Sequence, residues 1–76
     1  MNNLRRKELQ KVVDQIEGAY WGLETLRDEE EVYRDNIPEN LQNSQNYEKS
    51  KNAVSNLDDA LGNLSDAMDF IMSAIE

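Results

Sequence analysis

The sequence predicts an all-α protein, an antiparallel two-helix hairpin of the coiled-coil type that we expect to dimerise into a four-helix bundle. Three observations favour this fold class. In both halves of the 76-residue chain, apolar residues recur at alternating spacings of three and four, a pattern that lines one side of an α-helix. The only proline, Pro38, lies between the two halves. Clusters of opposite charge occupy the ends that an antiparallel pairing would bring together.

The first helix is expected over residues 3–35. One polar residue, Glu30, interrupts its apolar repeat, and Val13 and Tyr20 widen the repeat on one side. The predicted contact line, or seam, consists of Leu9, Val12, Ile16, Ala19, Leu23, Leu26, Glu30, Tyr33 and Ile37. At about 1.5 Å of rise per residue, such a helix is about 50 Å long.

A corner of residues 36–43 follows. Pro38 cannot continue the first helix, because it lacks an N–H and its ring collides with the preceding turn. A short helical turn can form after it, with Leu41 covering the end of the core. Asn43 or Ser44 then supplies a side-chain oxygen that caps the second helix. A short connection of this kind makes the two helices antiparallel neighbours.

The second helix is expected over residues 44–75. Its seam holds the same spacing for four heptads, and only Ser50 interrupts it. The seam residues are Tyr47, Ser50, Val54, Leu57, Leu61, Leu64, Met68, Ile71 and Ile75. Alanines recur every seven residues beside this seam, at Ala53, Ala60, Ala67 and Ala74. Such small side chains allow a neighbouring helix to approach closely.

Charge also predicts the antiparallel orientation. The basic residues of the first helix cluster at its start, whereas the second helix has no basic residue beyond Lys51. At the other end, the acidic run 28–31 would lie near Lys49 and Lys51. Each exposed pair contributes only some tenths of a kcal/mol, so these charges select an orientation more than they stabilise it.

The two seams also predict a register, in which the numbers of two facing residues add up to about 80. This register places Glu30 opposite Ser50, so that both polar interruptions form one polar core layer capped by two tyrosine hydroxyls. The other facing pairs would be Leu9–Ile71, Ile16–Leu64, Leu23–Leu57, Leu26–Val54 and Tyr33–Tyr47.

The composition argues against chemistry at this hairpin. The chain has no Cys and no His, which removes disulfides, thiolate sites and imidazole ligands. No serine has a neighbouring base, no glycine-rich phosphate loop occurs, and two helices offer no concavity of the size of an active site. We therefore predict that the protein is not an enzyme and binds no cofactor, metal or small-molecule substrate.

The net charge of −8 argues against direct binding to nucleic acid or to an anionic membrane, since both are negatively charged. No apolar run approaches the roughly 20 residues that span a bilayer, and no signal peptide is visible. A cytoplasmic location is expected.

Two regions are candidate interfaces. Trp21 lies outside the seam with Gly18 and Gly22 within one turn, and tryptophan is enriched at interface hot spots. The final turns of the second helix are apolar around most of their circumference, which indicates more than one neighbour. The candidate interface residues are Gly18, Trp21, Gly22, Phe70, Met72 and Ile75. A second copy of the chain would cover the C-terminal group, and Trp21 either contacts a partner or folds over the edge of its own hairpin.

The second helix also carries a candidate acidic surface, made of Asp58, Asp59, Asp66 and Asp69. These carboxylates either keep the helix solvated or engage a basic groove on another protein. Their spacing does not match a calcium-binding loop.

A resemblance rests on four segments of the chain, which are Arg5–Leu9, Asn36–Ser44, Tyr47–Lys49 and Asn56–Leu61. These segments are similar to small acidic helical proteins encoded by phages and prophages of Gram-positive bacteria. The resemblance implies a phage context, in which small acidic proteins often inhibit host defence systems or replication enzymes. It implies no particular binding residues.

Together these observations predict a homodimeric, non-enzymatic module that binds an unidentified protein, as a phage-encoded inhibitor of a bacterial defence system. Two other hypotheses remain open. One is a structural or assembly protein, or a small subunit of a larger complex, and the other is an acidic DNA mimic that blocks a nucleic-acid-binding enzyme.

Overall fold

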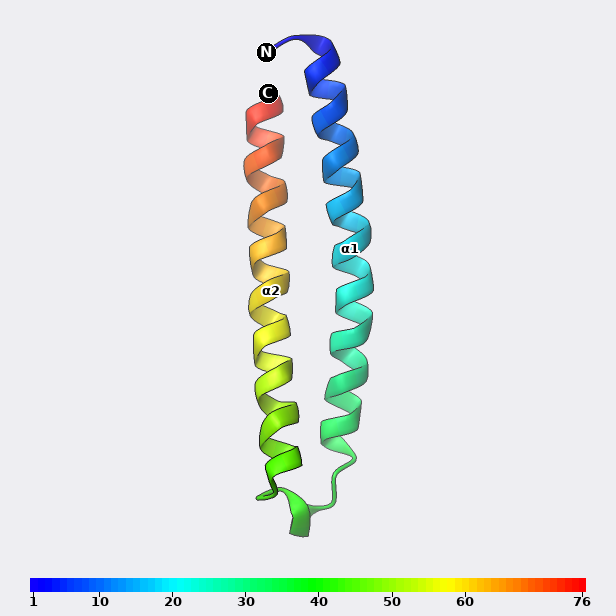
Figure 1. The fold of residues 1–76 in the computed structure, drawn as a ribbon, viewed down its shortest axis with the longest axis vertical. Helices are drawn as coiled ribbons and strands as arrows, with labels where there is room; N and C mark the ends of the chain where they lie inside the picture. Colours follow the sequence, from blue (N-terminus) through cyan, green and yellow to red (C-terminus); the bar gives the residue numbers. More distant parts are fainter.

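A computed structural model, which describes all 76 residues, consists of two long helices side by side and a short turn between them (Figure 1). The elements are α1 (Asn3–Asp35), η1 (Glu39–Leu41) and α2 (Gln45–Ile75). The molecule measures 60 × 15 × 13 Å, and the two termini lie at the same end. The predicted all-α, antiparallel hairpin is therefore confirmed.

Side-chain caps define where each helix begins. The Asn2 side-chain oxygen accepts a hydrogen bond from the Arg5 amide at 2.7 Å, and Ser44 accepts one from the Tyr47 amide at 3.3 Å. Each cap satisfies a backbone N–H that has no partner within its helix. Ser44, and not Asn43, is therefore the cap of α2.

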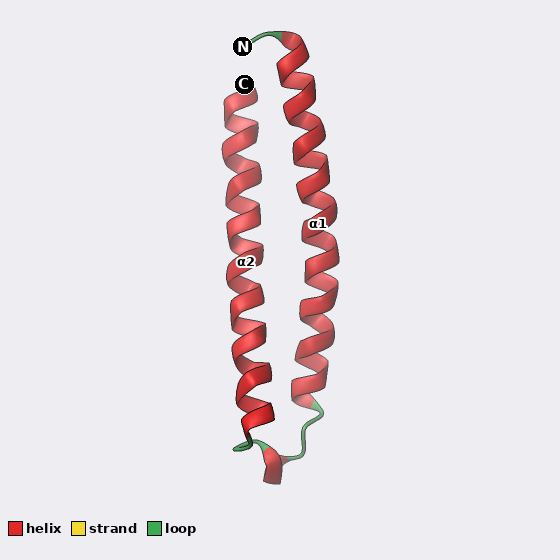
Figure 2. Cartoon of the chain, in the orientation of Figure 1, coloured by secondary structure: helices red, strands yellow, loops and turns green.

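The corner contains the expected short turn, η1, in which the Leu41 amide donates to the Pro38 carbonyl at 2.8 Å. This turn projects beyond the ends of both helices (Figure 2). For that reason Leu41 remains 49% exposed, and the prediction that it covers the end of the core is wrong.

The predicted seam of α2 is confirmed along its whole length. Ser50, Val54 and Leu61 are buried, and the six other seam residues are half-buried. Ala53, Ala60 and Ala67 beside the seam are half-buried as well.

The predicted seam of α1 consists of two lines of residues, each with a spacing of seven. The structure confirms one line, and the other is displaced by one residue. Val13 is 6% exposed, whereas its neighbour Val12 is 40% exposed. The line that packs on α2 is Arg6, Val13, Tyr20, Arg27 and Arg34. The line that the sequence favoured, which is exposed, is Val12, Ala19, Leu26 and Tyr33. The second line, which includes Leu9, Ile16 and Leu23, is as predicted.

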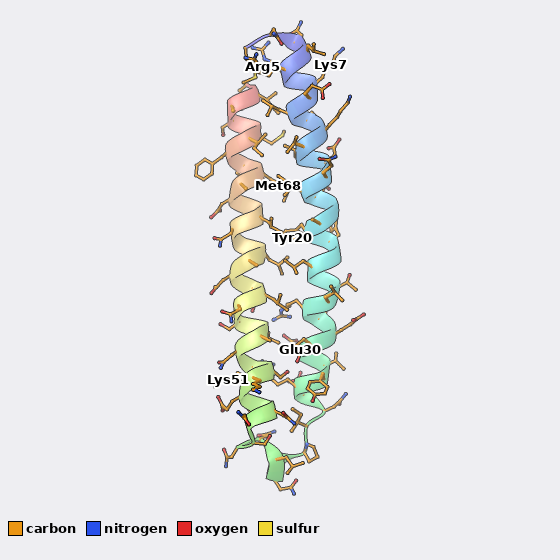
Figure 3. The ribbon with its side chains drawn as sticks, viewed as in Figure 1. Arg5, Lys7, Tyr20, Glu30, Lys51 and Met68 are labelled. Atoms are coloured by element: carbon orange, nitrogen blue, oxygen red, sulfur yellow. The ribbon has the colours of Figure 1, made fainter.

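The register is confirmed at both ends of the hairpin. The Ser50 hydroxyl donates a hydrogen bond to the Glu30 carboxylate, and the Arg6 guanidinium donates to the Ile75 carbonyl at 3.1 Å. The helices rise equally per residue, so these two contacts fix the layers between them. Side chains of both helices, Tyr20 and Met68 among them, occupy the space between the ribbons (Figure 3).

Two predicted details of this register are wrong. Leu26 and Tyr33 are exposed, so they do not face Val54 and Tyr47 across the seam. Since no tyrosine hydroxyl bonds to Glu30 or Ser50, that layer has no tyrosine cap; Glu30 and Ser50 bond to each other instead.

Candidate protein-binding surfaces

Arg27 forms the most connected polar cluster of the hairpin. Its Nε lies 2.7 Å from the Asp58 carboxylate of α2, which is the only ion pair between the two helices. The same guanidinium contacts Glu31 at 2.6 Å and Asp28 at 3.2 Å. The hydrogen bonds to Asp58 and Asp28 raise the pKa of Arg27 above its ordinary value. Arg27 therefore remains a fixed positive charge among carboxylates.

This cluster shows which side-chain lines share a side of the hairpin. Glu31 and Asp58 come from different helices, yet both bond to Arg27. Glu31 directly follows the seam residue Glu30 in α1, and Asp58 directly follows the seam residue Leu57 in α2. We call this side the polar flank, and its residues are Glu17, Glu24, Glu31, Lys51, Asp58 and Ser65.

The opposite side is formed by the residues that directly precede Val13 and Val54 and recur every seven positions. Between Val12 and Tyr33 of α1 these residues are exposed, and between Ala53 and Ala74 of α2 they are alanines. We call this side the apolar flank, and its residues are Val12, Ala19, Leu26, Tyr33, Ala53, Ala60, Ala67 and Ala74. None of them carries a charge, although the chain as a whole has a net charge of −8.

A third surface lies on the side of α1 that faces away from α2. Trp21 is 54% exposed there, and its ring packs edge-on against Tyr20 with centroids 5.5 Å apart. The Thr25 hydroxyl donates to the Trp21 carbonyl at 3.0 Å. A shallow, open depression begins at Thr25 and is lined by Thr25, Asp28, Glu29 and Val32. We call this surface the outer face of α1.

Two of the three glycines lie beside Trp21. A Cβ atom added at Gly18 or at Gly22 would meet nothing within 4 Å. Packing within the hairpin therefore does not require a glycine at either position. Both leave the α1 backbone bare beside an exposed tryptophan.

The three candidate interface residues near the C-terminus differ in exposure and in the side of α2 on which they lie. Phe70 is 76% exposed, and Met72 is also exposed. Ile75 is half-buried in the seam, and its carbonyl accepts the hydrogen bond from Arg6. Phe70 lies three residues after Ala67, which places it next to the apolar flank, whereas Met72, seven residues after Ser65, continues the α2 line of the polar flank.

The candidate acidic residues also differ in their contacts. Asp58 is engaged by Arg27, whereas Asp59, Asp66 and Asp69 are exposed and belong to no ion pair. No group of three Asp or Glu side chains lies close enough together to hold a metal ion. Neither helix is long and apolar enough to cross a membrane.

The charge clusters at the two ends of the hairpin do not form the expected ion pairs. Lys49 and Lys51 bond to no carboxylate, and Arg6 bonds to a backbone carbonyl at the end of α2. That carbonyl lies at the negative end of the helix dipole, which favours a cation.

Sequence reasoning missed Arg27 because arginine is not an apolar residue. The available signal was its place seven residues after Tyr20 and fourteen after Val13, the two residues that widen the apolar stripe. An arginine fits a seam when its methylene groups pack on apolar side chains and its guanidinium reaches the edge.

Comparison with known proteins gives no relative from which a role could be transferred: the chain matches no family model, no curated protein and no solved structure.

Proposed function

We propose that the protein is a non-enzymatic module that binds another protein through the outer face of α1, with Trp21 at the centre of the contact. The observation that carries this proposal is the exposure of Trp21, of which 54% is accessible. Tryptophan is among the residue types most enriched at interface hot spots, so an exposed tryptophan beside two bare glycines favours a contact with a partner.

The surroundings of Trp21 support a contact with a helix or an extended segment. Gly18 and Gly22 leave room for a neighbouring backbone to approach α1 closely. Thr25 and Val32 continue the same face at helical spacing, and the depression between them would accept a side chain. Apolar anchors surrounded by polar residues are the usual composition of an interface core.

The resemblance to phage proteins makes a bacterial defence protein the first class of partner to test. The mechanism would be inhibition of that protein by blocking the surface to which the hairpin binds. Affinity capture from a Gram-positive bacterial lysate at physiological salt should recover a protein with the wild-type chain and lose it with Trp21→Ala. Leu4→Ala is the matched control, because Leu4 is an exposed residue of α1 about 25 Å from Trp21 along the helix.

Trp21 is the only tryptophan of the chain, so its fluorescence reports contact directly. Addition of the purified partner should shift its emission to shorter wavelength, as the ring leaves water. A captured protein that binds Trp21→Ala as tightly as the wild type, with no shift, would contradict the proposal.

The exposed carboxylates of α2 favour a second candidate function, that of a DNA mimic. Asp59, Asp66 and Asp69 have no cationic partner within the chain. Binding through them alone would weaken steeply between low and physiological salt. Binding centred on Trp21 would change little over that range, so a salt titration of the captured complex separates the two functions.

A further inference from the structure

We infer that the apolar flank is a homodimer interface, in which α1 of one copy packs antiparallel against α2 of the other to give a four-helix bundle. This interface lies on another side of α1 from Trp21, so the inference does not depend on the proposed partner binding. The inference is based on which residues of α1 pack on α2. Because Val13 and Arg27 pack on α2, the other line of α1 is left exposed.

The hairpin alone exposes more surface than a compact protein of its size. Its accessible surface is 5678 Å², whereas a compact folded chain of 8.8 kDa exposes about 4,800 Å². The excess of about 900 Å² is close to the roughly 800 Å² that each partner buries in a standard interface. Only three apolar residues, Val13, Val54 and Leu61, are buried within the chain, which leaves a single copy without a sufficient core.

The two halves of the apolar flank complement each other. A twofold axis parallel to the helices brings the apolar flanks of two copies face to face, with α1 of each copy against α2 of the other. This rotation does not move any residue along the bundle axis. A residue of α1 in one copy and a residue of α2 in the other copy therefore lie at the same level when their numbers add up to about 80, as they do within one hairpin. Leu26 then lies level with Ala53 of the second copy, and Val12 with its Ala67. Large side chains opposite small ones are what close helix packing requires.

Charge is complementary at the same register. Glu29 and Lys49 lie one step outward from the apolar flank, on α1 and α2, and neither forms an ion pair within the chain. The twofold arrangement places Glu29 of each copy level with Lys49 of the other. Carboxylates are absent from the flank itself, so two chains of charge −8 meet where their repulsion is weakest.

The first test is the oligomeric state by sedimentation equilibrium at micromolar concentration. The wild-type chain should be a dimer, and Leu26→Glu should weaken its association at least tenfold. Val32→Glu is the matched control: Leu26 is 59% and Val32 is 58% exposed, both lie in α1, and only Leu26 belongs to the apolar flank. Val32→Glu should remain helical by circular dichroism, whereas Leu26→Glu should lose helix on dilution below the concentration at which it still associates, since a single copy lacks a sufficient core.

The second test is the arrangement of the two copies, and the absence of native cysteines makes it clean. A mixture of Leu26→Cys chains with Ala53→Cys chains should form the mixed disulfide dimer in preference to either homodimer. A mixture of Val32→Cys with Ala53→Cys should not. A wild-type monomer at these concentrations, equal effects of Leu26→Glu and Val32→Glu, or preferred disulfides between like chains would each overturn the inference.

Discussion

The Ser50 hydroxyl donates a hydrogen bond to the Glu30 carboxylate across the seam, and this contact joins the two polar residues that interrupt otherwise apolar lines. Ser50 is 4% exposed, and Glu30 is half-buried. A shift of either helix by one heptad would place each of them against apolar side chains without a partner. Because unpaired buried polar groups are costly, we expect this layer to fix the register of the hairpin.

The first prediction concerns this layer. Ser50→Ala should lower the free energy of unfolding by about 1 kcal/mol, because it leaves a half-buried carboxylate without its donor. The double variant Glu30→Leu with Ser50→Ala should recover that loss or exceed the wild type, since an apolar layer has no polar group to satisfy. Urea denaturation at matched protein concentration measures both changes.

Ser55→Ala is the control for this measurement, because Ser55 is an exposed serine of α2 and should change stability little. Equal stability of Ser50→Ala and Ser55→Ala would show that the Glu30–Ser50 hydrogen bond contributes nothing.

The second prediction concerns the cross-helix ion pair of Arg27 with Asp58. Asp58→Asn should lower the thermal unfolding midpoint at low ionic strength, and the difference from wild type should shrink as salt is added, because the pair lies at the surface and is screened. Asp59→Asn makes the same change of charge at an exposed residue without an ion pair. It should leave the midpoint unchanged or raise it, since it reduces the net negative charge. Parallel behaviour of the two variants would refute a specific role for Asp58.

The third prediction concerns the glycines. Gly18→Ala and Gly22→Ala should each stabilise the free protein by about 1 kcal/mol, because alanine favours the helix and its Cβ meets no other atom. If a partner approaches the outer face of α1, the same substitutions should weaken partner binding. Gly62→Ala, at an equally open position of α2, should stabilise the protein without affecting binding. Calorimetry and titration of Trp21 fluorescence measure the two effects separately.

Most of the fold could be predicted from local patterns. In α2 the line of Leu57, Leu64 and Ile71 is flanked by large apolar residues on one side and only by alanines on the other, so its seam was unambiguous. Pro38 marked the corner, and Asn43 or Ser44 the start of α2, through backbone chemistry that acts within a few residues. The polar pair Glu30 and Ser50 then fixed the register, because only one alignment lets the two interruptions meet.

The candidate surfaces were less predictable, because they depend on which side chains the hairpin covers. Ile75 was predicted both as a seam residue and as a candidate interface residue, and only the seam position is confirmed. Asp58 looked like a free carboxylate but bonds to Arg27. Trp21 was correctly placed outside the seam, because it lies away from both possible contact lines of α1.

The sequence by itself therefore determined two helices, their corner, their antiparallel order and their register. Only the tertiary structure decided which face of α1 meets α2. Val12 and Val13 flank the shared line of Leu9 and Ile16 on its two sides, so a spacing of three and four fits either one. The choice depends on the facing helix: the Arg27 side chain is only partly exposed, and its guanidinium reaches Asp58 of α2. That choice leaves Val12 and Leu26 exposed and so creates the apolar flank.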